Sequence, residues 1–272
     1  MSRTTVAELF EPGADFFLIA GPCVLEDDAL NLRIAEELAR LSEVLKLRII
    51  YKASFDKANR SKAGAARGPG LDKGLAQLAR IKHQTGLPVL TDVHEASQCA
   101  AVAEVCDVLQ IPAFLSRQTD LVVAAAATTR PVNIKKGQWM APEDMRGAAE
   151  KARQAGSRGV AVTERGTFFG YGDLVVDMRG FLRMREATGA RVVFDGTHSV
   201  QRPGRADGAS GGDPQFTVPL VHAAVAAGAD ALFLEVHPQP ETAPSDGSNM
   251  LRLENLEPLM RRVLAIREAA GV

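Results

Sequence analysis

Residues 48–54 read Arg48-Ile-Ile-Tyr-Lys-Ala-Ser54, a short apolar run that ends directly in polar groups. The same pattern recurs along the chain. The full set of apolar, β-branched runs is 16–20, 48–51, 88–90, 108–111, 132–134, 159–162, 192–194 and 232–234. The runs are short and mostly continuous rather than alternating, as expected of parallel strands that are buried on both faces. We therefore predict eight parallel strands.

Helical patterns lie between most of these runs. An apolar stripe at helical spacing is formed by Leu30, Ile34, Leu38, Leu41 and Leu45, and similar stripes fall within residues 71–81 and 256–266. Strand–helix alternation repeated eight times predicts an α/β fold, the (β/α)8 TIM barrel. We expect one catalytic domain over residues 1–272, with residues 1–14 as an N-terminal extension.

The composition indicates an ordinary soluble globular chain. Its 272 residues are 46% apolar and 24% charged, with a formal net charge of −1, so no global basic field points to nucleic acid or to a membrane. Residues 1–12 lack a basic stretch followed by an apolar one, and the apolar stretch 121–127 is too short to span a bilayer. We expect no secretory signal. The three cysteines, Cys23, Cys99 and Cys106, form no disulfide pattern, which favours a reducing, cytoplasmic setting.

Every predicted strand ends in groups capable of chemistry. These ends carry Cys23, Lys52 with Ser54, Asp92 with His94, Gln110, Lys135 with Lys136, Glu164 with Arg165, Asp195 with His198, and Glu235 with His237. In a (β/α)8 barrel the carboxyl ends of the strands form one rim, and the active site lies there. The sequence therefore predicts one crowded polar mouth.

Cations are frequent in one part of this mouth. The set comprises Lys52, Lys57, Arg60, Arg117, Lys135, Lys136 and Arg165, and it lies beside Ser54, Asn59 and Ser61. One phosphate group needs about two such cations. The set therefore indicates two anionic substrates, or one substrate that carries both a carboxylate and a phosphate. The alternative for any single member is an ordinary solvated charge.

A second group of residues has the donor atoms of a metal site. Cys23 follows the first strand, His198 follows the seventh, Glu235 ends the eighth and Asp246 lies in the loop after it. The first, seventh and eighth strands are neighbours in a closed barrel, so these side chains can converge. One sulfur, one nitrogen and two oxygen ligands suit Zn²⁺, Fe²⁺ or Mn²⁺. The alternative is that Cys23 is a buried small hydrophobe and His198 an ordinary polar residue of the rim.

Several longer motifs resemble those of a known enzyme family over nearly the whole chain. They are Lys52-Ala-Ser-Phe-Asp-Lys-Ala-Asn-Arg-Ser61, Thr91-Asp-Val-His-Glu95, Gln110-Ile-Pro-Ala-Phe114, Arg117-Gln-Thr-Asp-Leu121, Asn133-Ile-Lys-Lys-Gly-Gln138, Phe169-Gly-Tyr171, Leu174-Val-Val-Asp177 and Ser210-Gly-Gly212. In this order they are similar to the 3-deoxy-D-manno-octulosonate 8-phosphate (KDO-8-phosphate) synthases. The resemblance implies a barrel, typically a homotetramer, that condenses phosphoenolpyruvate with D-arabinose 5-phosphate and water and releases phosphate. The product supplies the KDO of lipopolysaccharide.

The resemblance also implies roles for individual residues. The residues expected at the phosphate and carboxylate of phosphoenolpyruvate are Lys52, Lys57, Lys135 and Arg165. Those expected at arabinose 5-phosphate are Asn59, Arg60, Ser61 and, reaching its phosphate from an adjacent subunit, Arg117. Ser54 and Gln110 belong to the same expected substrate-binding set.

The family divides by its use of metal. Metal-dependent members carry cysteine after Gly-Pro, and metal-independent members carry asparagine there. This chain has Cys23 at that position, and His198, Glu235 and Asp246 fall on the remaining ligand positions, so the resemblance implies a divalent cation (Zn²⁺, Fe²⁺ or Mn²⁺). The expected catalytic groups are Cys23, His198, Asp246 and Lys135, with Asp246 or His94 handling protons.

The chain departs from the family pattern after Ser61. Lys62-Ala-Gly-Ala-Ala stands where a serine and a histidine-containing loop are common, which leaves its effect on sugar selectivity open. Trp139 stands where phenylalanine or another apolar residue is usual.

Three alternatives remain at this point. The related synthase that uses erythrose 4-phosphate shares the barrel, but it usually has Lys-Pro-Arg-Thr where this chain has Lys57-Ala-Asn-Arg-Ser61, which favours the five-carbon sugar. A Schiff-base aldolase would use Lys135 or Lys136 as its nucleophile. A non-catalytic sugar-phosphate sensor would need neither the metal ligands nor two anion sites.

Overall fold

The structure, a computed structural model, describes residues 5–59, 64–169, 172–206 and 209–272. Its centre is a closed barrel of eight parallel strands. They are β1 (Phe17–Gly21), β2 (Arg48–Lys52), β3 (Val89–Asp92), β4 (Val108–Ile111), β5 (Val132–Lys135), β6 (Val160–Glu164), β9 (Arg191–Asp195) and β12 (Ala231–His237). Strand β12 pairs with both β9 and β1, which closes the sheet. The predicted (β/α)8 fold is confirmed, whereas the division into one domain with an extension stays a prediction.

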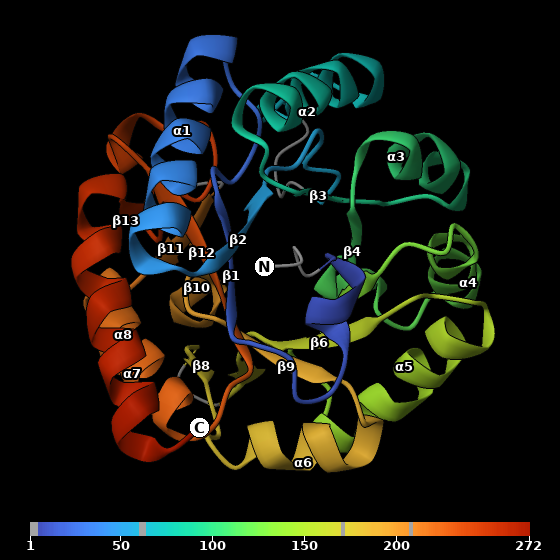
Figure 1. Ribbon diagram of the computed structural model, residues 1–272, viewed down its shortest axis with the longest axis vertical. Helices are drawn as coiled ribbons and strands as arrows, with labels where there is room; N and C mark the ends of the chain where they lie inside the picture. The colour runs from blue at the N-terminus through green and yellow to red at the C-terminus, as the bar shows by residue number, and fades with distance from the viewer. Residues whose placement is uncertain (1–4, 60–63, 170–171, 207–208) are drawn as a thin grey trace.

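In the described part of the chain, eight α-helices form a ring around the strands (Figure 1). They are α1 (Asp28–Leu45), α2 (Leu71–Thr85), α3 (Cys99–Val105), α4 (Thr119–Ala127), α5 (Met145–Gln154), α6 (Gly180–Thr188), α7 (Thr217–Ala226) and α8 (Leu256–Ala270). The start of α1 follows the rule for acidic helix N-termini, because the Asp27 side chain accepts from the amides of Ala29 and Leu30. Among the described residues no helix combines the length and the apolar character needed to cross a membrane.

Shorter elements fill the connections. The additional strands are β7 (Thr167–Phe168), β8 (Leu174–Val175), β10 (Gln201–Ala206), β11 (Ala209–Gly212) and β13 (Leu251–Arg252). The 3-10 helices are η1 (Ala7–Phe10), η2 (Ala96–Gln98), η3 (Ala113–Leu115), η4 (Pro142–Asp144), η5 (His198–Val200), η6 (Pro214–Phe216), η7 (Pro240–Thr242) and η8 (Leu253–Asn255). Strands β7 and β8 form one antiparallel pair, and β10 and β11 form another.

The barrel strands other than β5 contribute to two apolar layers, because successive side chains point to opposite faces. Outward residues such as Leu18, Ile49 and Val162 pack with the helices in the larger core cluster. Inward residues such as Ile50, Leu90 and Val193 form a second cluster inside the barrel. Burial on both faces explains why the strands read as continuous apolar runs in the sequence.

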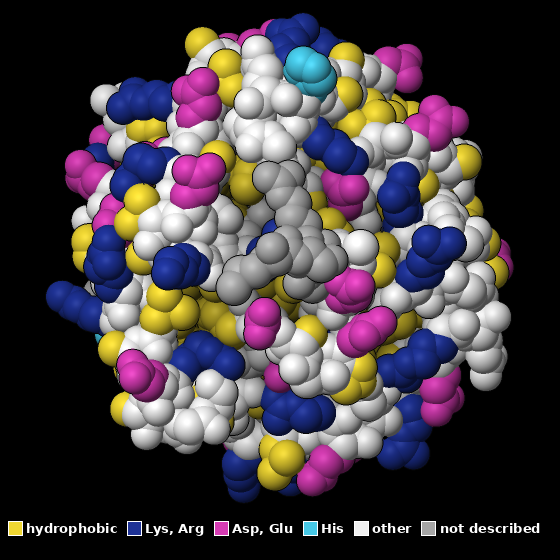
Figure 2. Space-filling model, viewed as in Figure 1, with side chains coloured by type: hydrophobic (Ala, Val, Ile, Leu, Met, Phe, Trp, Pro, Cys, Tyr) yellow, Lys and Arg dark blue, Asp and Glu magenta, His cyan; other side chains and the backbone are white. Residues whose placement is uncertain are grey.

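The N-terminal segment closes the amino end of the barrel. Leu9 and Phe10 of η1 are buried in the inner cluster, where the ring centroids of Phe10 and Phe17 lie 5.5 Å apart. Gly159, just before β6, packs against Phe10 so closely that a larger side chain would clash, because an added Cβ atom would lie 2.5 Å from Cβ of Phe10. In Figure 1 the short dark-blue helix η1 lies inside the ring of α-helices. Figure 2, from the same side, shows positive and negative side chains interspersed over this face.

The inner face changes from apolar to charged within one step of two residues. Ile50 is followed at the next inward position by Lys52, Leu90 by Asp92, and Val193 by Asp195. The same step leads from Phe233 to Glu235. The alternation of the strands therefore carries the polar strand ends into the interior of the carboxyl end, which is the predicted mouth.

Candidate active site and metal centre

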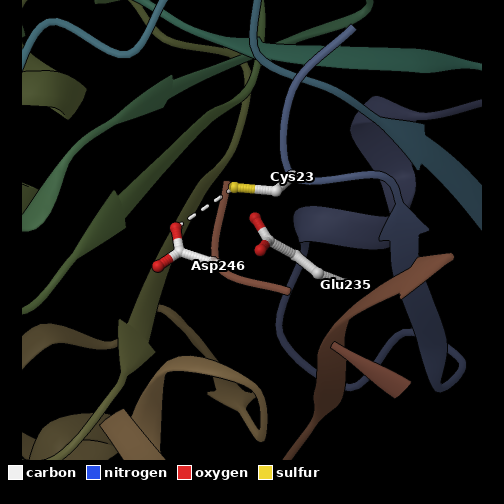
Figure 3. A group of neighbouring side chains, drawn as sticks. All are labelled: Cys23, Glu235 and Asp246. Carbon is white, nitrogen blue, oxygen red and sulfur yellow. Dashed lines mark hydrogen bonds between the residues drawn. The ribbon is translucent and has the colours of Figure 1, made fainter. Parts of the chain in front are cut away.

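Three of the four predicted metal ligands converge in the mouth. Cys23 Sγ and one carboxylate oxygen each of Glu235 and Asp246 lie within 4.8 Å of one another (Figure 3). Cys23 follows β1, Glu235 lies on β12 and Asp246 lies in the loop between η7 and β13. Asp246 adopts a left-handed backbone conformation with φ 49°, which aspartate tolerates better than most residues. The Cys23 thiol donates to Asp246 Oδ2 over 3.2 Å.

His198, the fourth predicted ligand, lies beside this group rather than within it. Its Nε2 atom is 3.7 Å from Glu235 Oε1, and its Nδ1 atom is 2.8 Å from Asp195 Oδ2. A carboxylate at Nδ1 places the imidazole proton there and leaves the Nε2 lone pair facing the cluster, as is common for histidines that bind metals.

The donor set fits a borderline divalent cation. Glu235 is fully buried, and its Oε1 atom accepts from Lys52 Nζ over 2.9 Å. Its Oε2 atom is also buried and has no hydrogen-bond partner in the described part of the chain. An unpaired buried carboxylate oxygen is costly unless a cation or a donor meets it. Sulfur from Cys23, nitrogen from His198 and oxygen from Glu235 and Asp246 are ligands that Zn²⁺, Fe²⁺ and Mn²⁺ accept.

Burial controls the state of the Cys23 thiol. It raises the pKa of Cys23 far above its usual range, and the nearby Glu235 carboxylate adds to this effect. Without a cation the group is therefore a neutral thiol, which agrees with its role as a donor to Asp246 Oδ2 and to Ser245 Oγ at 3.1 Å. A metal ion would displace this proton, because only the thiolate is a ligand.

Buried ion pairs balance the charges of the mouth. Lys135 Nζ lies 2.6 Å from Asp195 Oδ2 and 3.6 Å from the ring centroid of Phe233. Burial alone would raise the pKa of Asp195, but His198 and Lys135 outweigh it and hold that pKa far below its usual range. Burial also opposes the ionisation of Glu235, but Lys52 and His198 lower its pKa in the same way. The carboxylates of Asp195 and Glu235 therefore stay ionised.

Lys57 is half-buried and lies at the edge of the mouth. Burial alone would lower its pKa, but the surrounding anionic groups, including Glu235 and Asp92, raise it instead. Asn59, at the end of the described segment, is exposed. Arg60 and Ser61, also predicted at the sugar phosphate, lie outside the described residues.

A belt of hydrogen bonds joins five adjacent strand ends. Thr163 donates to Asn133 Oδ1 over 2.7 Å, and Asn133 Nδ2 donates to Gln110 Oε1 over 2.9 Å. Gln110 and Ser54 then both donate to the carboxylate of Asp92. The predicted substrate residues Ser54 and Gln110 are thus held by Asp92, whose pKa is lowered by Lys52 and Lys57 against the effect of burial.

Arg165 reaches the mouth from the end of β6. It is buried, and its Nη2 atom donates to Gln201 Oε1 over 2.6 Å. Its Nη1 atom is buried without a hydrogen-bond partner among the described residues. Gln201 Nε2 in turn donates to Asp246 Oδ1 over 3.1 Å. Arg165 and the metal-ligand group therefore share one bridging amide.

Two predicted cations lie elsewhere. Arg117 is exposed and lines a surface hollow of about 300 Å³ together with Trp139 and Lys151. The placement of Lys136 in the mouth was wrong, because it follows Lys135 on the strand and points to the opposite side of the barrel wall. Its Nζ atom donates there to backbone carbonyls and to Thr167 Oγ1.

Two polar residues of the site, Gln201 and Ser245, were not predicted from the sequence. Asp92 and Asp195 were predicted to lie in the mouth, but no individual role was assigned to them. For Asp92 and Asp195 the signal is present in the sequence, because each lies two positions after an inward apolar residue. For Gln201 and Ser245 no local pattern exists, since both reach the site from irregular connections.

Comparison with known proteins agrees with the motifs. A sequence profile of the DAHP synthetase I family matches residues 9–269. A protein of Synechococcus sp. named 2-dehydro-3-deoxyphosphooctonate aldolase is 52% identical over 99% of this chain and 95% of its own length. Proteins of the same name from Magnetococcus marinus and Rhodopseudomonas palustris are 53% and 54% identical, over 92% and 91% of this chain and 86% of their own lengths. The resemblance drawn from the motifs is confirmed, and the chain belongs to the DAHP synthetase I family.

Proposed function

We propose that this protein condenses phosphoenolpyruvate with D-arabinose 5-phosphate and water to give 3-deoxy-D-manno-octulosonate 8-phosphate and phosphate. The name shared by relatives that match nearly the whole chain supports this reaction. The enzyme is then a 3-deoxy-8-phosphooctulonate synthase, a transferase that forms a carbon–carbon bond. Its product serves the synthesis of lipopolysaccharide KDO.

The observation that carries the proposal is the inward set of buried cations at one end of the barrel. Lys52, Lys135 and Arg165 are each less than 10% exposed, and Lys57 is half-buried beside them. Burying this many cations is unfavourable unless anions meet them. The phosphate and carboxylate of phosphoenolpyruvate supply such anions, and charge-assisted hydrogen bonds to them are strong.

On substrate binding, the anionic groups of the substrate would take the place of carboxylates as partners of the buried cations. Lys135 is paired with Asp195, and Lys52 with Glu235, so each ammonium is already oriented before the substrate arrives. Arg165 offers its buried Nη1 atom, which lacks a hydrogen-bond partner in the described structure. Preoriented donors of this kind hold the anionic groups of phosphoenolpyruvate without a large reorganisation during the reaction.

We also propose that Cys23, His198, Glu235 and Asp246 hold one divalent cation. When bound, such an ion supplies a Lewis acid that polarises an oxygen atom of the aldehyde or of water. Asp195 keeps the proton of His198 on Nδ1, so that Nε2 stays available. Asp246 Oδ2 accepts the hydrogen bond of the Cys23 thiol and is the nearest base for that proton when the thiolate forms.

Assembly would complete the sugar-phosphate site. We propose a homotetramer in which Arg117 of one subunit reaches the arabinose 5-phosphate bound to its neighbour, which is consistent with its exposed position outside the mouth. Sedimentation would give the oligomeric state. Mixing Arg117→Ala with Cys23→Ala subunits should restore part of the activity if the site is shared, and no recovery would contradict the sharing. The free cysteines are consistent with a cytoplasmic enzyme.

The test measures phosphate release from phosphoenolpyruvate with either arabinose 5-phosphate or erythrose 4-phosphate. The protein is assayed after treatment with a chelator and again with Mn²⁺, Zn²⁺ or Fe²⁺ restored. We expect activity with the five-carbon sugar that chelation removes and metal restores. Activity with erythrose 4-phosphate alone would instead identify the related heptulosonate synthase, since the matching profile is that of the DAHP synthetase I family.

A Schiff-base aldolase is the second candidate, since one lysine of the mouth has the required environment. Burial lowers the pKa of Lys135, which favours a neutral amine. Asp195 opposes this effect at 2.6 Å from Nζ, so we expect the ammonium. Borohydride treatment with both substrates, followed by mass spectrometry, should give no adduct at Lys135, and an adduct there would favour the aldolase.

A further inference from the structure

Lys136 is fully buried although it lies outside the mouth. Its side chain is 0% exposed. Around Nζ the nearest oxygens are those of Thr167 Oγ1 at 3.0 Å, Met140 O at 3.2 Å, Gly137 O at 3.3 Å, Gly166 O at 3.4 Å and Glu164 Oε1 at 3.4 Å. An ammonium group has only three hydrogens, so these five oxygens offer more acceptors than it can use at once.

Four of the five oxygens belong to two separate connections, and the fifth belongs to Glu164, the last residue of β6. Gly137 and Met140 lie in the segment that follows β5, and Gly166 and Thr167 lie in the segment that follows β6. A backbone hydrogen bond of 2.9 Å from the Phe168 amide to the Gln138 carbonyl joins the same two segments. Lys136 is therefore the charged centre of a clamp between them.

Each clamped segment begins at a cation of the mouth. Lys135 directly precedes Lys136 at the end of β5, and Arg165 directly precedes Gly166 after β6. Backbone pairing of Lys135 with Thr163 sets the register of the two strands up to this point. The Lys136 amide continues this pairing with a hydrogen bond of 2.8 Å to the Thr163 carbonyl, and beyond it the clamp joins the two segments.

Stability alone does not account for a charge at this position. A buried ammonium paired with Glu164 loses its hydration, and an apolar side chain of similar size often stabilises such a site equally well. What a lysine adds is direction, since it holds oxygens from two segments at hydrogen-bond distance at once. Sub-ångström placement of the binding groups is what an anion site requires.

We propose that Lys136 is a positioning residue that sets the separation of Lys135 and Arg165 for the anionic groups of phosphoenolpyruvate. This inference rests on the proposed function. It deepens that proposal by assigning the second lysine of the Asn133-Ile-Lys-Lys-Gly-Gln138 motif. The sugar phosphate is expected at other residues, so only one of the two substrates should depend on Lys136.

Two variants separate positioning from charge balance. Lys136→Met keeps the length of the side chain and removes the ammonium. Lys136→Met combined with Glu164→Gln also removes the carboxylate that would be left unpaired, while the amide oxygen can still accept from the Gly166 amide as Glu164 Oε1 does at 2.7 Å. The double variant should therefore be the more stable of the two.

Both variants should show a KM for phosphoenolpyruvate that is raised roughly 10- to 100-fold, since small displacements of binding groups have effects of this size. The KM for arabinose 5-phosphate should not change. A normal KM for phosphoenolpyruvate in the double variant would overturn the inference, because the lysine would then only neutralise Glu164. Equal increases in both KM values would also overturn it.

A second measurement does not depend on the reaction. Hydrogen exchange at the Phe168 amide reports the clamp directly, and it should accelerate in both variants. Unchanged exchange would overturn the inference even if the kinetics changed. If the wild-type protein binds no phosphoenolpyruvate in calorimetry, the proposed function fails, whereas the exchange experiment still tests whether Lys136 joins the two segments.

Discussion

The two ends of the barrel are built from the same strands and differ in almost every physical respect. At the amino end, Leu9, Phe10 and Phe17 fill the interior with apolar atoms. At the carboxyl end the interior holds Lys135 and Asp195 with the other charged groups. Along β2, β3, β9 and β12 only two residues separate the apolar interior from the charged one. The difference indicates that burial of apolar side chains at the amino end stabilises the fold. This stabilisation offsets the cost of burying the charged groups that the carboxyl end holds in place for binding.

The largest expected effect is on the carboxyl end. Replacing Cys23 by alanine should lower the rate about 1000-fold, because a bound Lewis acid contributes several kcal/mol and each ~1.4 kcal/mol is a factor of ten. Elemental analysis should show that the bound metal is lost, while the thermal midpoint stays near that of the wild type. The matched control is Cys99→Ala, which removes a buried thiol outside the mouth. Full activity of Cys23→Ala in chelator would remove the metal from the proposal.

The next largest effect concerns the amino end. Here a substitution should lower the stability of the fold and leave the activity unchanged. Phe10→Ala should destabilise the fold by about 3–5 kcal/mol, as is usual for loss of a buried aromatic ring, and leave kcat/KM of the folded protein unchanged. Denaturant unfolding and steady-state kinetics measure the two quantities. Phe216→Ala is the control, since that ring is 52% exposed. A loss of kcat/KM in Phe10→Ala would break the separation of the two ends.

Acid should weaken the carboxyl end selectively. The pKa values of Asp92, Asp195 and Glu235 are held low in the folded state by neighbouring cations. Their contribution to the free energy of unfolding is therefore complete above the unfolded-state pKa of about 4. It begins to be lost as the pH falls below that value and is fully lost only below the lower folded-state pKa, with about 2–3 kcal/mol for each such group.

The acid experiment is denaturant unfolding over a series of pH values. Phe10→Ala serves as the comparison, because apolar burial does not titrate. Its stability curve should run parallel to that of the wild type at lower free energy. A flat wild-type curve below pH ~4 would show that these carboxylates do not gain stability from their partners.

The smallest expected effect returns to the amino end. Thr129, in the connection before β5, is exposed and has φ 63°, a left-handed conformation that disfavours β-branched residues. Thr129→Gly should stabilise the fold by about 0.5 kcal/mol, the strain relieved less the added entropy of the unfolded chain. Thr128→Gly, at φ −67°, should destabilise it. Calorimetric melting points of the two variants provide the comparison, and destabilisation by Thr129→Gly would contradict the strain.

Much of this arrangement could be predicted from the sequence. All eight strands were predicted within a few residues, because each is a continuous apolar run between polar ends. The predicted grouping of Cys23, Glu235 and Asp246 follows from the order of the strands in a closed barrel. The position of Lys136 was not predicted, because the two adjacent lysines were treated alike, whereas consecutive strand residues face opposite sides.

The sequence by itself determined the architecture and the chemistry available at each strand end. These depend on local patterns, namely apolar periodicity and the residue that follows each run. Only the tertiary structure decided the partners, such as Cys23 with Asp246 across 223 positions of the chain, Lys135 with Asp195, and Phe10 with the barrel floor. Contacts between distant segments depend on how the whole chain packs, and no short stretch of sequence contains that information.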